Sequence, residues 1–426
     1  SFGCVLQNRT LFAGISLLPG GSLWVFQKNA PVSKETYFDP HSLEKQSILP
    51  GAEYYEKLKD TFTRILNRYF QGRQKVGMSL TGGLDGRLIM AWLRCRLEDL
   101  PCYTFGGSYR DCTDVRIARQ IAGLCSRSHR TIAVGSAFIR EFPDLARRAV
   151  YISDGTMDVT GAVELYVNRI ASAIAPIRMT GNYGSEILRG NVAFRPGRLD
   201  ERLIQPEFAD LVRNAAMTYG REAEGHRQSF IAFKQVPWHH YARLSVEQSQ
   251  LTLRTPYLDN DLVSLTYQAS PESLLSEVPS LRLIAEGNDG LGKIATDRGV
   301  LYRPTPLIGK IQHALQELTF KAEYSFDYGM PQWLASIDGV LASLHLEKLF
   351  LGRHKFSHFR IWYRDNLSKY LKEILLDSRT LQRPYFNGIF LEEMVSSHTR
   401  GDRNYTLEIH RVLTSELIQR QLVEQS

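Results

Sequence analysis

The stretch from Val76 to Arg87, VGMSLTGGLDGR, decides the fold of this chain. Its first half reads as a short buried strand, and Gly82-Gly83 form a turn before a helix whose first turn carries Asp85. Glycine has no Cβ, and the first N–H groups of a helix have no partner within it, so an anion can approach this backbone closely. Asp85 could hold Mg²⁺ against that anion. The spacing matches neither a Walker A loop nor the G-x-G-x-x-G of dinucleotide folds, and a plain strand–helix turn remains an alternative.

Strands and helices alternate after this turn. The patterns predict strands at 75–80, 102–105, 130–134 and 177–180, and helices at 85–97, 114–124, 136–150 and 162–174. Repeated units of this length predict an α/β fold, a doubly wound parallel sheet covered by helices on both faces. Ligands bind beyond the carboxyl ends of such strands. We therefore expect the turns at Thr81–Asp85, Gly106-Gly107 and Thr180-Gly181 to meet at a nucleotide cleft.

Three regions are expected along the 426 residues. Residues 1–50 are rich in turns, predict two or three short strands, and are too few to fold alone. Residues 51–200 hold the alternating strands and helices. From about Asp200 to the C-terminus, 201–426, strand signals fade and helical periodicity dominates, which predicts a helical part packed beside the sheet. The chain begins with Ser1 and not with methionine, so it is read as a fragment or a processed product.

Composition narrows the class of protein. No apolar run approaches the ~20 residues of a membrane span, so no membrane partner is expected. The net charge is +7, and the densest basic cluster, between Arg353 and Arg364, is interpreted as a solvated face and not as a nucleic-acid site.

The five cysteines lack C-x-x-C spacing, which favours reduced thiols and a cytoplasmic protein. Neither His239-His240 nor the pair His354 and His358 has a further ligand at metal-site spacing, so no structural metal is expected.

Six blocks, in the right order, resemble the asparagine synthetase family. The second of them resembles the S-G-G-x-D-S pyrophosphate loop of the ATP-pyrophosphatase families, with Thr81 and Gly86 in the two serine positions. The blocks are Thr10–Phe38, Thr81–Asp85, Phe105–Asp114 with Ala118-Arg119 and His129, Met179–Glu186, Arg254–Asp259, and Glu393–Glu416. The resemblance implies a sheet of ATP-pyrophosphatase type (adenine nucleotide alpha hydrolase-like) with a helical C-terminal subdomain. Residues 1–50 then correspond to a remnant of the family's N-terminal glutaminase half.

The resemblance also implies the chemistry. A carboxylate is a poor acyl donor, so family members transfer AMP from ATP to it, release pyrophosphate, and let an amine attack the acyl-adenylate. ATP and Mg²⁺ are the implied cofactors, with donors and metal on the developing pyrophosphate charge. The implied nucleotide-binding residues are Leu80, Thr81, Gly82, Gly83, Asp85, Gly107, Thr180 and Gly181. The implied catalytic residues are Asp85, Glu186, Arg254 and Lys293, of which Asp85 and Glu186 would hold the metal.

Several positions depart from the family pattern. Gly86 removes a phosphate-facing hydroxyl, and Asn182–Ile187 replace most of the acidic S-G-E-G-A-D-E block. The family's cleft lysine has no clean match, and the candidates are Lys293, Lys310, Arg298 and Arg303. A structural ion pair between Arg254 and Asp259 is an equal alternative to a catalytic role. Neither Ser1 nor Cys4 replaces the N-terminal cysteine of glutamine-dependent members. The chain is therefore expected to use free ammonia, to take ammonia from a separate glutaminase, or to be a fragment of a longer protein.

Three functions remain open. The first is adenylation of a small-molecule or peptide carboxylate, aspartate being favoured, followed by amide formation with ammonia. The second is closure of a β-lactam or a peptide macrolactam with another amine, which the altered Asn182–Ile187 block favours. The third is a non-catalytic scaffold. The presence of Asp85 and of both loop glycines, Gly82 and Gly83, argues against the scaffold. The hydroxyl missing at Gly86 and the missing cleft lysine argue for it. A homodimer is one of the oligomeric states that the sequence allows.

Overall fold

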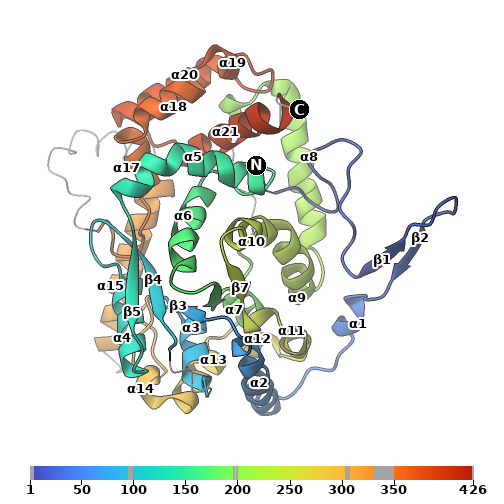
Figure 1. Cartoon of the computed structure of the whole chain (residues 1–426), viewed down its shortest axis with the longest axis vertical. Helices are drawn as coiled ribbons and strands as arrows, with labels where there is room; N and C mark the ends of the chain where they lie inside the picture. Colours follow the sequence, from blue (N-terminus) through green and yellow to red (C-terminus); the bar gives the residue numbers. More distant parts are fainter. Residues whose placement is uncertain are drawn as a thin grey trace.

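The computed structural model describes residues 4–94, 99–194, 197, 200–302, 308–329 and 350–424; for 308–312 it describes the backbone alone. A five-stranded sheet lies at its centre, in the order β5-β4-β3-β6-β7, with every neighbouring pair parallel (Figure 1). Its strands are β3 (Val76–Ser79), β4 (Cys102–Gly107), β5 (His129–Val134), β6 (Ile177–Thr180) and β7 (Thr252–Arg254). The chain starts at β3, adds strands on one side, and then crosses to the other side. This order places a topological switch point between β3 and β6.

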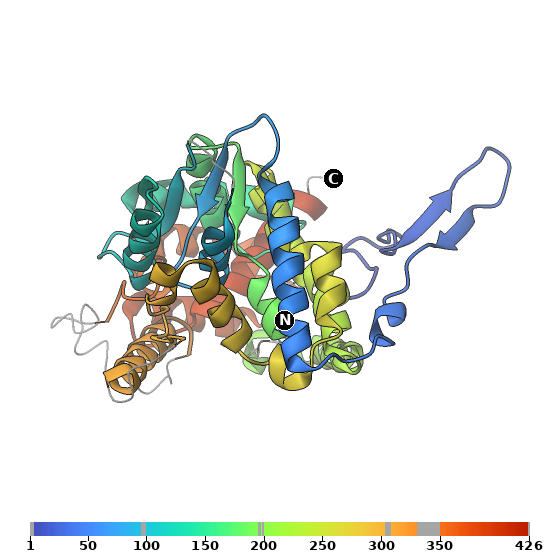
Figure 2. The same cartoon turned by 90° about the horizontal axis from the view of Figure 1, so that it is seen from below.

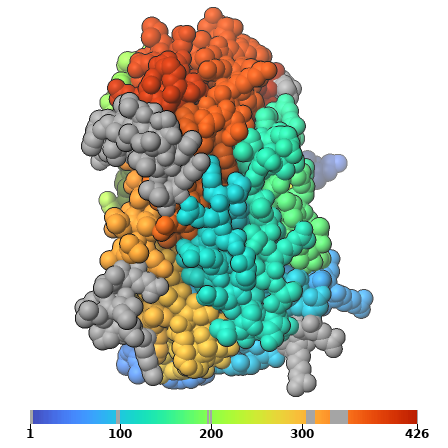
Figure 3. Space-filling view, turned by 90° about the vertical axis from the view of Figure 1, so that its left-hand side faces the viewer, coloured from blue at the N-terminus to red at the C-terminus, as the bar shows by residue number. Residues whose placement is uncertain are grey.

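Helices pack on both faces of the sheet. Their bounds are α1 His41–Glu44, α2 Gly51–Leu66, α3 Leu84–Trp92, α4 Thr113–Leu124, α5 Ser136–Ile152, α6 Gly161–Ser172, α7 Gly184–Arg189, α8 Pro206–Ala223, α9 Arg227–Phe230, α10 Tyr241–Gln248, α11 Asn260–Thr266, α12 Pro271–Leu274, α13 Val278–Gly287, α14 Asp289–Gly292, α15 Ile308–Tyr324, α17 Phe359–Arg364, α18 Ser368–Leu375, α19 Ser378–Leu381, α20 Gly388–Arg400 and α21 Thr406–Ile418. Figure 3 shows one side of the molecule, where α4 (cyan to teal) lies beside α14 (yellow).

Two hydrophobic cores correspond to the two faces. One joins α2, α3, α4, α7, α11 and α13 to strand side chains such as Met78 and Met179. The other joins α5, α6, α17, α18, α20 and α21 to Tyr103 and Ile132. Because successive side chains of a strand point to opposite faces, β6 buries Ile177 and Met179 in the first core and turns Arg178 to the second face. The predicted doubly wound α/β fold with a helical C-terminal part is confirmed.

The fold differs from the sequence prediction in two elements. β7 lies in the region where helical periodicity dominates the sequence and no strand is predicted. Three residues are too few to show a period-2 pattern. α3 ends at Trp92, well before the predicted end at residue 97, and Leu93 is extended; residues 95–98 lie outside the described part.

The N-terminal segment extends away from this body. Strands β1 (Ser22–Val25) and β2 (Ser33–Thr36) form an antiparallel hairpin that projects from the side of α9 and α11 (Figure 2). All four residues of β2 are exposed, and so are Leu23, Val25 and Phe26. The hairpin matches the strands expected within residues 1–50. No helix in the described part of the chain is both long and apolar enough to cross a membrane.

Candidate active site

The segment of residues 80–83, here called the glycine loop, connects β3 to α3. The N–H of Gly82 donates to Asp114 Oδ1 at 2.7 Å, and the N–H of Asp297 donates to the Gly82 carbonyl at 3.3 Å. A Cβ at Gly82 would lie 2.9 Å from Asp114 Oδ1 and 3.0 Å from Asp297 Cβ, so this position accepts no side chain without rearrangement. The backbone of the glycine loop is therefore fixed by two acidic residues from distant parts of the chain.

Buried charges surround this loop. Burial raises the pKa of Asp114 to about 6, helped by the charge of Asp297 and opposed by the Gly82 hydrogen bond. Burial also raises the pKa of Asp297. The guanidinium of Arg87 is buried and donates to the carbonyls of Gly82 (2.9 Å), Ala295 (3.2 Å) and Ile294. This support by Arg87 was not predicted from the sequence, where the only signal is a basic residue within the apolar run of the predicted helix.

A second loop, residues 181–183, follows β6 and packs directly against Asp85 and Gly86 in the first turn of α3. A Cβ at Gly181 would lie 2.4 Å from the backbone nitrogen of Gly86, and a Cβ at Gly184 would lie 2.3 Å from Asp85 Cγ. Tyr183, at φ 72°, adopts the left-handed conformation that bulky residues rarely take. Glycines at 181 and 184 thus let the two loops pack closely enough to hold Asp85 between them.

Asp85 is the side chain on which both loops converge. Its Oδ2 accepts from Arg189 of α7 at 2.8 Å, and its carbonyl accepts from the hydroxyl of Tyr257 at 2.8 Å. Its other carboxylate oxygen, Oδ1, is buried without a hydrogen-bond partner among the described residues. A buried carboxylate oxygen in that state is suited to bind a cation.

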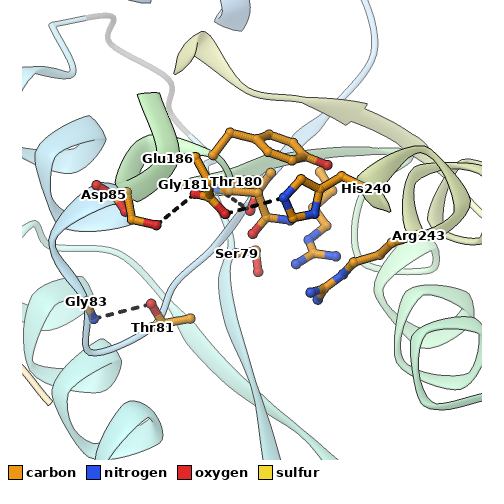
Figure 4. Close-up of a pocket in the computed structure, with 14 residues that line it drawn as sticks. Ser79, Thr81, Gly83, Asp85, Thr180, Gly181, Glu186, His240 and Arg243 are labelled. Atoms are coloured by element: carbon orange, nitrogen blue, oxygen red, sulfur yellow. Dashed lines mark hydrogen bonds and ion pairs between the residues drawn. The ribbon is translucent and has the colours of Figure 1, made fainter. Parts of the chain in front are cut away.

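The two loops and α10 enclose a pocket of about 230 Å³ at the switch point (Figure 4). Figure 4 shows Asp85 on one side of the pocket and His240 and Arg243 on the opposite side. The residues that line it are Ser79, Thr81, Gly83, Asp85, Gly86, Arg178, Thr180, Gly181, Asn182, Tyr183, Ser185, Glu186, His240 and Arg243. The location agrees with the rule that open parallel sheets bind ligands where the strand order reverses.

Glu186 and His240 face each other within the pocket. Glu186 Oε1 lies 3.7 Å from His240 Nε2, and its Oε2 accepts from the Ser185 hydroxyl at 2.7 Å. Burial, more than the nearby positive charges, lowers the pKa of His240 to about 3. The imidazole is therefore neutral at pH 7 and forms no charged pair with the Glu186 side chain.

Six of the expected site residues line this pocket together: Thr81, Gly83, Asp85, Thr180, Gly181 and Glu186. Leu80, the first residue of the glycine loop, is fully buried in the first core and does not line the pocket. Gly107 lies inside β4, paired with Val134, and a Cβ there would lie 3.1 Å from Phe356 Cα. The expectation that Gly106-Gly107 form an open turn at the cleft is wrong, because β4 runs two residues further than predicted and the chain at Phe356 covers its end.

The expected cationic residues lie elsewhere. Lys293 is 73% exposed, pairs with Asp289 and does not line the pocket, so the structure does not bring it to the other site residues. Arg254 donates to the carbonyls of Tyr69 (2.9 Å) and Gln71 (2.7 Å), which ties β7 to the chain after α2. It forms no ion pair with Asp259, and both residues are described. That pair was one of two equal alternatives for Arg254, and the structure gives it backbone partners instead.

Of the other three candidates for the cleft lysine, the structure describes the side chain of Arg298 alone. Arg298 pairs with Glu317 and lies over the ring of Phe320. The side chain of Lys310 and all of Arg303 lie outside the described residues. The pocket has its own cations, Arg178 and Arg243, which the sequence analysis did not select because neither belongs to a recognisable motif.

The residues present fit Mg²⁺ and a phosphorylated ligand. Asp85 offers its unpartnered Oδ1, and Glu186 offers a second carboxylate in the same pocket. No group of three or more acidic, histidine or cysteine side chains suited to a metal occurs in the described ranges. This set suits magnesium, which is typically held by one or two carboxylates together with phosphate oxygens of the substrate.

The comparison with known families agrees with this geometry. The model of the asparagine synthase family matches residues 57–288, and no curated protein matches the chain. The matched range contains all five strands of the sheet, both loops and α10. The match covers more than half of the 426 residues and includes every residue that lines the pocket. The chain therefore belongs to the asparagine synthase family of ATP-dependent amide-forming ligases.

Proposed function

We propose that this protein adenylates a carboxylate with ATP, releases pyrophosphate, and forms an amide from the activated acyl group and ammonia. Aspartate is the acyl substrate that we favour. The observation that carries the proposal is the pocket in which the glycine loop, Asp85 and Glu186 meet at the switch point of the sheet. Adenylation is needed because an oxide ion is too poor a leaving group for direct attack by an amine.

The chain's own residues can divide the work within this pocket. Thr81 and Gly83 present hydroxyl and backbone groups where pyrophosphate charge would develop. Asp85 and Glu186 would hold Mg²⁺, which when bound would neutralise part of that charge. Glu186, held by the Ser185 hydroxyl, can also accept a hydrogen bond from the attacking amine.

Two internal contacts of the site favour a non-catalytic role instead. The Gly82 N–H already donates to Asp114, and Asp85 Oδ2 is already paired with Arg189. Internal partners of this kind would satisfy the site without a ligand. A scaffold protein descended from an enzyme would keep such contacts after its chemistry was lost.

The deciding experiment measures AMP and pyrophosphate release from ATP–Mg²⁺, with aspartate and ammonium present or omitted in turn. Release that depends on aspartate, with asparagine as product, supports the proposal. Release that depends on another carboxylate and needs no ammonia moves the protein to lactam closure. Correctly folded protein that releases no AMP with any of a broad panel of carboxylates is the result expected of the scaffold.

A further inference from the structure

A buried arginine, Arg189, lies behind the central carboxylate of the pocket. Its Nη2 donates to Asp85 Oδ2 at 2.8 Å, and its Nη1 donates to Ser280 Oγ of α13 at 3.3 Å. The side chain of Arg189 is 9% exposed, and that of Asp85 is 17% exposed. Arg189 does not itself line the pocket, so any effect that it has on a ligand acts through Asp85.

Helix α7 fixes the position of this guanidinium group. Arg189 is the last residue of α7, and Glu186 lies three residues earlier, which places both on one face of the helix. Gly190 ends the helix in the left-handed conformation, at φ 58°, and its carbonyl accepts from Arg227 Nε at 2.6 Å. The helix therefore presents one carboxylate and one guanidinium group to the same part of the site.

The two oxygens of the Asp85 carboxylate are in different states. Oδ2 accepts from Arg189, whereas Oδ1 is buried and has no hydrogen-bond partner among the described residues. The main chain of Asp85 is also held, because its carbonyl accepts from the Tyr257 hydroxyl at 2.8 Å. Arg189 therefore leaves one oxygen of this carboxylate for a cation and occupies the other.

The guanidinium group also changes the charge balance of the site. Burial acts to lower the pKa of Arg189, but the charge and the hydrogen bond of Asp85 raise it overall, so the group stays charged. The formal charges of Asp85 and Arg189 sum to zero. Of the two carboxylates that line the pocket among the described residues, only Glu186 then remains uncompensated. A divalent cation at Asp85 Oδ1 would be repelled by the guanidinium group on the other oxygen, and such repulsion is strong away from water.

We propose that Arg189 is a positioning residue that prevents a divalent cation from binding alone to Asp85 and admits it only together with a phosphorylated ligand. The inference rests on the proposed function, since it concerns the metal that would accompany ATP. In the empty pocket Arg189 neutralises Asp85, so Mg²⁺ alone should bind weakly. A triphosphate carries several negative charges, and these would offset the repulsion between the cation and Arg189.

Titration with Mn²⁺, followed by electron paramagnetic resonance, can test this role without turnover. Carboxylate oxygens bind Mn²⁺ as they bind Mg²⁺, and the signal of the free ion falls when it binds. We expect weak binding to the wild-type protein. Arg189→Gln and Arg189→Met should bind Mn²⁺ roughly tenfold to a hundredfold more tightly, because Asp85 is then uncompensated. A merely structural role would weaken metal binding when Arg189 is replaced, so the direction of the change separates the two roles.

Calorimetry with a non-hydrolysable ATP analogue gives a second measurement. The affinity for the analogue is measured with Mn²⁺ and with no divalent cation. In the wild type, Mn²⁺ should strengthen binding of the analogue strongly. In Arg189→Gln this dependence should become smaller, because the cation no longer needs the phosphates to overcome the guanidinium charge.

Three variants keep the result interpretable. Arg189→Lys retains the charge and should bind Mn²⁺ like the wild type. The double variant Asp85→Asn/Arg189→Gln should lose the gain in affinity, because the gain acts through Asp85. Arg383→Gln is the matched control for the loss of a buried arginine. Arg383 is 12% exposed, pairs with the fully buried Glu416 and lies outside the pocket, so this variant should bind Mn²⁺ like the wild type.

Ser280→Ala tests the same role if neither neutral variant at position 189 folds. It removes only the hydroxyl that accepts from Arg189 Nη1, so the guanidinium group is held less firmly beside Asp85. We expect Mn²⁺ to bind roughly twofold to threefold more tightly to this variant.

The outcomes separate this inference from the proposed function. Equal or weaker Mn²⁺ binding by folded Arg189→Gln, or a gain that persists in the double variant or appears in Arg383→Gln, would overturn the role of Arg189. If neither neutral variant folds, unchanged binding by Ser280→Ala overturns it. A gain in Arg189→Gln while the wild type releases no AMP would keep this role and reject the ligase. AMP release by the wild type, with Mn²⁺ affinity unchanged in Arg189→Gln, would keep the ligase and reject this role.

Discussion

At the scale of single residues, the pocket depends on buried charges that each have a specific partner. Asp85 is paired with Arg189, Asp114 accepts the Gly82 N–H, and Arg87 donates to the Gly82 carbonyl. Charged groups are expensive to remove from water, so each of these contacts offsets a desolvation cost that would otherwise destabilise the fold. Their removal should therefore affect both the site and the stability of the protein.

Asp85→Asn tests the central carboxylate. The variant keeps the shape of the side chain but loses the charge that would bind Mg²⁺ and pair with Arg189. We expect AMP release to fall by roughly a hundredfold or more, because stabilisation of transition-state charge is usually the largest catalytic contribution. Unfolding in urea should show a loss of about 1–3 kcal/mol from the weakened ion pair. Unchanged turnover in a folded variant would show that the site is elsewhere.

Asp114→Asn tests the raised pKa of this buried carboxyl group. The native pKa of about 6 lies above the ordinary 3.8, so the native state binds the proton more tightly than the unfolded state does. The corresponding stability is present below pH 3.8 and is lost as the pH rises through 6. The free energy of unfolding of the wild type should therefore fall relative to the variant by about 2–3 kcal/mol between pH 4 and 7.

Chemical denaturation at several pH values measures this difference directly. Asparagine retains an oxygen that can accept the Gly82 N–H, so the variant changes the titration more than the contact. Parallel pH profiles for the two proteins would contradict the assignment of the titration to Asp114. Because the charges of Asp114 and Asp297 interact, the difference between the two pH profiles includes a change in the titration of Asp297.

At the scale of elements, the close approach of two strand–helix turns makes the site. The turn after β3 and the turn after β6 pack directly against each other, and Tyr183 and the helix α7 present Glu186 and Arg189 from the second turn. Parallel neighbouring strands end at the same edge of the sheet, so their turns are forced together. The fit requires small residues at the contact, and the two glycines meet that requirement.

Gly184→Ala tests this packing against Gly220→Ala as a matched control. A Cβ at 184 would lie 2.3 Å from Asp85 Cγ, so the loops must separate, and we expect a loss of about 1–3 kcal/mol of stability together with most of the activity. Gly220 lies in α8 with nothing within 4 Å of an added Cβ. Gly220→Ala should raise stability by up to ~1 kcal/mol and leave activity unchanged, because alanine favours a helix. Thermal unfolding and AMP release measure both effects.

At the scale of the whole molecule, stability is concentrated in the two cores and not in the N-terminal hairpin. The cores bury aromatic and aliphatic side chains on both faces of the sheet. The hairpin projects from the body (Figure 2), and its residues Leu23, Val25 and Phe26 are exposed. An isolated two-stranded hairpin is marginally stable in water. The hairpin should therefore contribute little to the global free energy of unfolding.

Phe62→Ala and Phe26→Ser compare the core with the hairpin. Phe62 is fully buried in α2, and its truncation should cost about 3–5 kcal/mol through lost burial and a cavity. Phe26 is 72% exposed at the end of β1, so Phe26→Ser should change the free energy of unfolding by less than about 0.5 kcal/mol. Urea denaturation gives both values. A large loss in Phe26→Ser would show that the hairpin packs against another surface in solution.

The sequence by itself determined the layered α/β architecture and the main features of the pocket. The four strongest strands and their helices follow from hydrophobic periodicity, which local sequence carries. Asp85 and Glu186 fall in the same pocket because parallel strands must end at one edge, and that topology follows from the strand–helix alternation.

Only the tertiary structure decided which cations serve the pocket and what holds its loops. Arg178 looks like an ordinary strand residue and Arg243 like an ordinary helix residue, yet both line the pocket, while Lys293 is turned to solvent. The partnership of Gly82 with Asp114 and Asp297 joins residues far apart in the chain. Local patterns carry no information on such contacts, because the direction of a long charged side chain is set by whichever partners the packed fold brings within reach.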